Sequence, residues 1–155
     1  MKKNEHPLRI TAARVLEDWG MMMIDEPSSE GTQLFTLDTP LYHSIIELHG
    51  AVSGSVSIIA QEDFLSALAH NLLCEPEDVQ LDSHQQEDAF RELGNVLAGN
   101  FITEAYGDDV VFDLLNPAVS TISPESLSAI LERNVVFEFL VDGAPVAFTF
   151  NIQSK

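Results

Sequence analysis

Basic residues are scarce in this 155-residue sequence. Seven lysines and arginines stand against 25 aspartates and glutamates, which gives a formal net charge of −18 at pH 7. A charge of this sign and size repels nucleic acid backbones and anionic membrane surfaces, so we predict neither as a partner. No apolar run approaches the roughly 18 residues that a membrane helix needs. The two lysines near the amino terminus have no apolar segment behind them, so no export signal is predicted.

Cysteine is almost absent, because Cys74 is the only one. The chain therefore has no internal disulfide, which suits a reducing cytoplasm. We expect Cys74, which follows Leu72 and Leu73, to be a small buried hydrophobic residue. The five histidines lack a metal-binding spacing, and no serine-hydrolase motif or phosphate-binding glycine loop is present. We predict a cytoplasmic protein that binds no metal or cofactor of its own.

The length and the 45% hydrophobic content suit a single domain, residues 1–155. Helical spacing of apolar residues predicts helices over 7–19, 62–73, 83–105 and 124–132, with Ser83 and Ser123 as N-caps. Runs of β-branched and aromatic residues predict strands over 33–38, 43–49, 53–60, 110–115, 135–141 and 146–152. The pair Asp142-Gly143 is typical of a hairpin turn.

Two stretches of the sequence look alike. LEDWG, QLFTLDTP and a strand hairpin resemble FRELGN, VVFDLLNP and a second strand hairpin, which makes Pro40 correspond to Pro117. We infer a degenerate internal duplication. The predicted fold class is α+β, a mainly antiparallel sheet covered by helices, with the 83–105 helix outermost.

The predicted 83–105 helix has two unlike faces. At 100° per residue, one arc of about 60° holds four residues that are not apolar: Asp88, Glu92, Asn95 and Gly99. The far side holds Phe90, Leu93, Leu97 and Phe101. An ordinary amphipathic helix with a solvated polar face would give the same spacing. Gly94 and Gly99 argue for more, because a glycine inside a helix costs about 1 kcal/mol relative to alanine unless packing or close approach compensates.

Residues 88–117 carry a family resemblance. They begin D-A-F-R-E-L-G-N-V-L-A-G and end, after a strand, in L-L-N-P. This pattern resembles the signature of the CheC/CheX/FliY chemotaxis phosphatases: an Asp or Ser, a Glu four residues on, an Asn three further, and a Pro some twenty residues downstream. Those positions are Asp88, Glu92, Asn95 and Pro117, and Gly99 also fits the family pattern. The resemblance implies a CheC-like fold and a phosphatase that acts on the aspartyl phosphate of a CheY-like receiver domain.

The resemblance also implies a role for each residue. Asn95 would hold a water in line with the aspartyl phosphate, and Glu92 would pair with the receiver lysine. An amide suits the first role because it donates and accepts hydrogen bonds without titrating. Asp88 and Gly99 would contribute to partner binding, and Pro117 would fix the chain beside the helix. The receiver would supply the Mg²⁺.

The single intact motif resembles CheX more than CheC, which has two, and implies a homodimer. In the first half of the chain Glu17 is kept, but Ala13 and Gly20 stand where the acid and the asparagine would be. That copy lacks the water-positioning amide, so we expect it to be inactive.

A second function remains open from the sequence, that of a non-catalytic docking protein binding a receiver or a flagellar-switch component. The intact Glu92 and Asn95 favour the phosphatase. Because receiver domains are often acidic themselves, general repulsion would slow their encounter with this chain unless local pairing overcomes it or the partner is basic.

Overall fold

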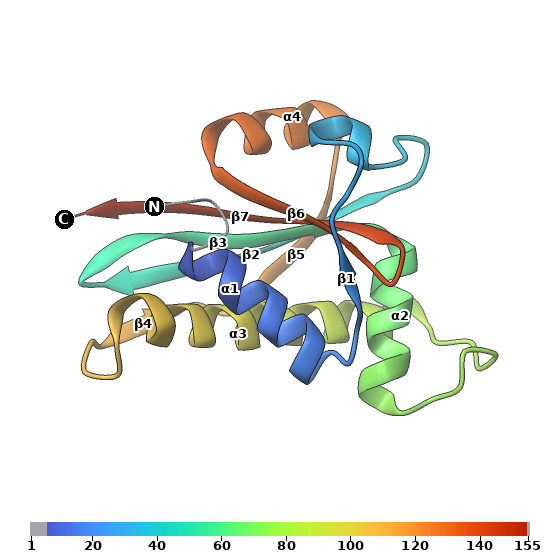
Figure 1. Ribbon diagram of the computed structural model, residues 1–155, viewed down its shortest axis with the longest axis horizontal. Coiled ribbons are helices and arrows are strands. Elements are labelled where there is room, and N and C mark those ends of the chain that lie inside the picture. The colour runs from blue at the N-terminus through green and yellow to red at the C-terminus, as the bar shows by residue number, and fades with distance from the viewer. Residues whose placement is uncertain (1–5, 155) are drawn as a thin grey trace.

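A computed structural model describes residues 6–154, and all of its strands join one sheet (Figure 1). The helices are α1 (Pro7–Arg14), α2 (Glu62–Leu73), α3 (Ser83–Tyr106) and α4 (Pro124–Arg133), with a π-helical turn η2 (Val15–Trp19) and a 3-10 turn η3 (Gly31–Leu34). The strands are β1 (Ile24–Asp25), β2 (Leu41–Gly50), β3 (Val52–Ala60), β4 (Phe112–Leu114), β5 (Ala118–Ile122), β6 (Val135–Val141) and β7 (Ala144–Ser154).

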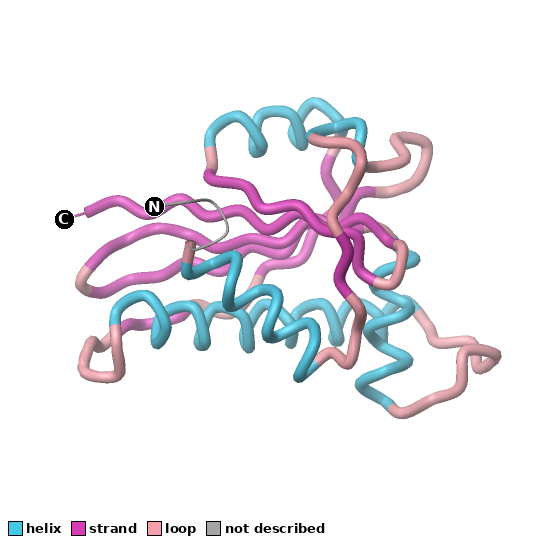
Figure 2. The backbone as a smooth tube through the Cα atoms, viewed as in Figure 1, coloured by secondary structure: helices cyan, strands magenta, loops and turns pink. Residues whose placement is uncertain are grey.

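The sheet lies between two layers of helices. α1, α2 and α3 cover one face, and α4 with η3 covers the other (Figure 2). Every strand pairing is antiparallel. The predicted α+β class with a mainly antiparallel sheet is therefore confirmed. None of the helices within residues 6–154 has the length and apolar character to span a bilayer.

Two hairpins form the centre of the sheet, as predicted. β2 pairs with β3 from Tyr42 opposite Ala60 to Leu48 opposite Gly54. β6 and β7 are joined by Asp142 and Gly143, whose φ angles of 49° and 82° are both positive, as a type I′ hairpin turn requires. The Asp142 carboxylate also accepts a hydrogen bond from the Met23 backbone N–H (2.9 Å), which ties the turn to the chain just before β1.

The strand order is symmetric between the two halves of the chain. Apart from β5, which pairs with β2 off this path, it runs β1-β6-β7-β3-β2-β4. Exchanging β1 with β4, β2 with β6 and β3 with β7 reverses the order, and each exchange joins strands that come in the same chain order in their halves. This order is what an internal duplication predicts. The expected correspondence of Pro40 with Pro117 is wrong, because Pro40 directly precedes β2 whereas Pro117 directly precedes β5. Under the exchange β2 matches β6, so the two prolines stand at different places in their halves.

The strand predicted over 33–38 does not form. Gly31–Leu34 is a 3-10 turn, and the chain from there to β2 is a loop held by the side chain of Gln61. The Gln61 amide accepts from the Thr36 backbone N–H (3.2 Å) and donates to the Thr36 backbone carbonyl (2.5 Å). These side-chain bonds satisfy the loop backbone in place of a neighbouring strand.

Other differences from the sequence predictions lie at the edges of the sheet. β4 covers 112–114 rather than 110–115, and β1 and β5 were not predicted. β1 has two residues, too few for a periodic pattern to be read. β5 pairs with the edge of β2 and has mostly exposed side chains, so it lacks the apolar alternation that marks a half-buried strand.

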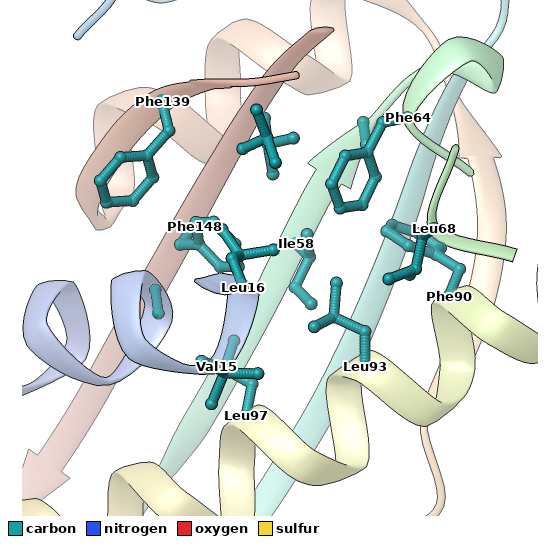
Figure 3. Close-up of a cluster of buried hydrophobic side chains, with 14 of the residues drawn as sticks. Val15, Leu16, Ile58, Phe64, Leu68, Phe90, Leu93, Leu97, Phe139 and Phe148 are labelled. Carbon is teal, nitrogen blue, oxygen red and sulfur yellow. The ribbon is translucent and has the colours of Figure 1, made fainter. Parts of the chain in front are cut away.

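Each face of the sheet has its own apolar core. Beneath α1, α2 and α3, side chains of the central strands such as Ile58 and Phe148 meet Leu16, Phe64 and Leu93 (Figure 3). A smaller cluster lies under α4: Phe35, Leu41, Ile59, Leu127 and Ala147. Burying each large apolar side chain stabilises the fold by about 1.5–3 kcal/mol, so the larger core dominates.

α2 covers Glu62–Leu73, as predicted, but Cys74 is exposed rather than buried. Its φ of 55° places it in the left-handed conformation that ends a helix, and the Glu75 N–H donates to the His70 carbonyl (3.0 Å). The reversal of the chain at this residue takes its side chain away from the apolar stripe of the helix.

His70 joins α2 to the acidic loop that precedes α3. Its Nδ1 lies 2.7 Å from the Ser66 carbonyl oxygen and its Nε2 lies 2.6 Å from the Val79 carbonyl oxygen. Carbonyl oxygens only accept, and a neutral imidazole has one N–H, so both bonds form only when the ring is protonated. These two bonds, with Glu77 and Glu75 adding to them, raise the pKa of His70 above its ordinary value of 6.5.

This bridge makes stability depend on pH. A pKa raised by folding means that the folded state holds the proton more tightly, so the stabilisation is complete below pH 6.5 and is lost as pH rises through the folded pKa. Urea unfolding of wild type and His70→Gln from about pH 5 to 9 measures this. We expect the free energy of unfolding of wild type to exceed that of His70→Gln at low pH, and this difference to shrink as pH rises. A constant or growing difference would contradict the protonated bridge.

Candidate functional site

The long helix α3 begins at Ser83, the predicted start, but its N-cap lies one residue earlier than predicted. Asp82, not Ser83, is its N-cap: the Asp82 carboxylate accepts from the Gln85 N–H (2.8 Å) and the Gln85 side chain accepts from the Asp82 N–H (3.0 Å). This reciprocal pair satisfies backbone groups that the first turn leaves open. The helix ends at Tyr106 with Gly107 as C-cap, close to the predicted end at 105.

The two faces of α3 differ as the spacing predicted. Phe90, Leu93, Leu97 and Phe101 are buried against the sheet and its other helices. Phe90, Leu93 and Leu97 point from α3 toward the strands in Figure 3. Asp88, Glu92 and Asn95 are exposed on the other side. Burial of the apolar face therefore orients the polar face toward solvent.

Glu92 and Asn95 have no internal partners. Neither side chain makes a hydrogen bond or an ion pair with any residue in the range 6–154. They are three residues apart, which places them side by side on the helix. Asn100, on the same helix, is different, because its amide donates to the Val96 carbonyl (2.7 Å). A carboxylate and an amide are thus both available to another molecule at adjoining positions.

Asp88 is engaged within the chain. One of its carboxylate oxygens lies 2.8 Å from Arg91 Nη1, and the other lies 3.3 Å from His84 Nε2. Neither neighbour was singled out from the sequence, although the spacings of three and four residues are those at which helix side chains pair. An exposed pair of this kind contributes at most about 1 kcal/mol to stability.

The two helical glycines have different surroundings. A Cβ on Gly94 would lie 2.8 Å from Ile46 Cδ1 and 3.1 Å from Ser44 Oγ, both on β2. A Cβ on Gly99 would have nothing within 4 Å. Gly94 thus permits close packing of helix and sheet, whereas Gly99 leaves open space on the face of Glu92 and Asn95.

The same substitution at the two glycines should have opposite effects. Gly99→Ala should raise the free energy of unfolding by about 0.5–1 kcal/mol, because alanine favours the helix and meets no neighbour. Gly94→Ala should lower it by about 1 kcal/mol, because the methyl group displaces the buried Ile46 side chain. Urea unfolding of the two variants checks this, and equal effects would refute the packing role of Gly94.

Pro117 lies at the corner between β4 and β5 and is buried. Both strands contact α3. Just before the corner, the Leu115 N–H donates to the Glu47 carbonyl (3.1 Å), which fixes this turn of the chain to β2. Because proline has a fixed φ and no reactive group, the position defines the shape of the chain beside the helix.

A shallow groove of about 240 Å³ lies beside Asp88. Its lining comes from the end of α2 and the start of α3: Leu72, Leu73, Gln85, Asp88 and Ala89. Leu73 is 47% exposed, so an apolar side chain lies open to solvent at this groove. Sequence reasoning missed this feature, because it depends on where two helices meet.

No group of histidine, cysteine, aspartate and glutamate side chains within residues 6–154 is arranged to hold a metal ion. Burial lowers the pKa of His43, whose Nε2 has no hydrogen-bond partner in that part of the chain.

The corresponding segment of the first half does not form a second site. There Glu17 is exposed, but Gly20, which stands where the asparagine would be, is buried.

The chain matches a known protein family. The model described as chemotaxis phosphatase CheX matches residues 42–140, a range that contains all five residues of the pattern from Asp88 to Pro117. A search of curated protein sequences finds nothing similar to this chain.

Solved structures share the fold. A chain of the CheX–CheY–BeF3–Mg²⁺ complex from Borrelia burgdorferi is 23% identical, with 96% of each chain covered and a TM-score of 0.64. CheX from Desulfovibrio desulfuricans is 15% identical over 95% of this chain and 97% of its own, with a TM-score of 0.66. FliY from Thermotoga maritima is 16% identical over 97% and 85%, with a TM-score of 0.60. At these identities the likeness establishes the fold.

Proposed function

Because this chain belongs to the CheX family of chemotaxis phosphatases, we propose that it hydrolyses the aspartyl phosphate of a CheY-like receiver domain. The pathway is chemotaxis or another two-component circuit. One observation carries the proposal: Glu92 and Asn95 stand side by side, exposed and without a partner within residues 6–154, on a helix whose opposite face is buried.

Asn95 is the residue that positions the attacking water. Phosphoryl transfer requires little covalent chemistry from the protein, so placing the water accounts for much of the rate gain. The amide accepts a hydrogen bond from the water and donates another without changing its charge. Its lack of an internal partner supports this role, because no existing bond has to break when the receiver docks.

Glu92 is the residue that pairs with the receiver lysine. A carboxylate bonded to an ammonium group contributes about 1.5–3 kcal/mol when the pair is shielded from water. Glu92 lies one turn from Asn95, so this pair would seat the helix with the amide at the phosphoryl group. Gly99 leaves space for close approach of the receiver, and Pro117 maintains the adjoining surface.

The Mg²⁺ is supplied by the receiver. The chain has no metal-binding group of its own within residues 6–154. The related complex from Borrelia burgdorferi contains CheX, CheY, BeF3 and Mg²⁺ together, which supports this assignment. We further propose that the protein is cytoplasmic, where receivers occur, and that it is a homodimer, as the resemblance to CheX implies.

Asn95→Ala tests the chemical step. Wild type should accelerate the decay of a phosphorylated receiver. The decay rate with Asn95→Ala should be at least about a hundredfold lower than with wild type, which corresponds to a barrier about 2.7 kcal/mol higher. Binding should be retained, since the amide adds little to docking. Asn100→Ala is a matched control, because its amide is already bound to Val96 and its loss should leave the decay rate unchanged.

Glu92→Gln tests the docking step. We expect KM for the phosphorylated receiver to rise by about tenfold or more, because loss of the charge weakens the bond to the receiver lysine. Glu87→Gln changes the same charge one turn and a half earlier on α3 and serves as control. Equal effects of the two variants would show that general repulsion, and not a specific pair, determines affinity.

A docking protein without catalysis is the second candidate. The exposed carboxylate of Glu92 and amide of Asn95 suit binding to a receiver whether or not hydrolysis follows. The two candidates differ in one measurement: a docking protein binds receivers but leaves their rate of dephosphorylation unchanged.

A further inference from the structure

Positive charge is confined to very few places on this acidic chain. Within residues 6–154 the lysine and arginine side chains are Arg9, Arg14, Arg91 and Arg133. Arg9 pairs with Glu26, and Arg14 pairs with Glu104. Arg91 is the only one of the four on α3, and it lies one turn before Asn95. The face of Glu92 and Asn95 therefore has one permanent cation at its border.

The Arg91 guanidinium is held by one hydrogen bond, and most of its N–H donors remain available. Nη1 donates to Asp88 at 2.8 Å, and no other residue in the described range accepts a hydrogen bond from this side chain. Arginine has five N–H donors in a rigid fork, so the rest of the fork remains open. The side chain is 39% exposed, so these donors are within reach of another molecule.

We propose that Arg91 binds a carboxylate on the surface of the receiver, beside its phosphorylation site, and that Asp88 orients Arg91 for this contact. The proposal rests on the proposed function, because it assigns the partner of the same helix face. It also gives Asp88 a role through Arg91 rather than a direct contact. Receiver domains are often acidic themselves, and a guanidinium pairs best with a carboxylate, so Arg91 is matched to a surface of that charge.

The direction of Arg91 separates it from the chemical step. Its bond to Asp88 draws the guanidinium toward the amino-terminal end of α3, whereas Asn95 lies one turn toward the other end. Arg91 therefore contacts the border of the docked receiver and not the phosphoryl group. Such a contact acts on encounter and affinity, because charge pairs at the border of an interface steer association and depend on salt.

Arg91→Gln should raise KM for the phosphorylated receiver by about fivefold and leave kcat unchanged. Added salt should raise kcat/KM more than it does for wild type, because the attraction that salt weakens is lost while the general repulsion that salt screens remains. Arg91→Lys keeps the charge and should restore most of the association rate. Arg133→Gln removes an equal charge from α4, on the other side of the sheet, and should leave both constants as in wild type.

A double-mutant cycle tests the role of Asp88. Asp88→Asn is measured alone and in the Arg91→Gln background, with KM as the readout. If Asp88 acts through Arg91, the two effects on KM are not additive. Additive effects would overturn the orienting role.

The outcomes separate this inference from the function on which it rests. If wild type does not accelerate dephosphorylation, the proposed function fails. If wild type accelerates it and Asn95→Ala does not, but Arg91→Gln matches Arg133→Gln in KM and salt dependence, only the role of Arg91 fails. A fall in kcat at unchanged KM would also overturn it, because that places Arg91 at the transition state.

Discussion

The close contact between α3 and β2 at Gly94 determines where the candidate site lies. The missing Cβ lets the helix backbone approach Ile46 and Ser44, and the large side chains on either side of Gly94 then pack against the sheet. Helix side chains keep fixed angular relations, so anchoring one face fixes the direction of the other. The orientation of Glu92 and Asn95 thus comes from residues that have no functional group.

Much of this arrangement could be predicted from the sequence, because it depends on long periodic segments. The bounds of α2 and the two central hairpins follow from apolar spacing and turn residues. The N-cap of α3 was misplaced by one residue for a local reason: Asp82 and Ser83 both favour capping, and each is followed three residues later by a glutamine. Sequence alone does not distinguish two adjacent candidates that share the same signal.

The features that were missed arise from contacts between distant segments. The residues around Thr36 have the composition of a strand, but they form a loop because Gln61, 25 residues further on, binds their backbone. The groove at Leu73 exists only because α2 and α3 meet there. Arg91 is local, but it lies about 60° away from Asp88 around the helix, outside the arc that holds Glu92 and Asn95, so the motif spacing does not point to it. The motif identifies Glu92 and Asn95 at the centre of the face but not the charged residue at its border.

The symmetry of the sheet contrasts with the asymmetry of its helices. Exchange of the two halves reproduces the strand order, but α1 has 8 residues and closes in the turn Val15–Trp19, whereas α3 has 24. Of these two helices, only α3 carries both the acid and the amide of the family pattern. Under the proposed function the stoichiometry is one receiver per chain, and the second helix of the duplicated plan serves the core alone.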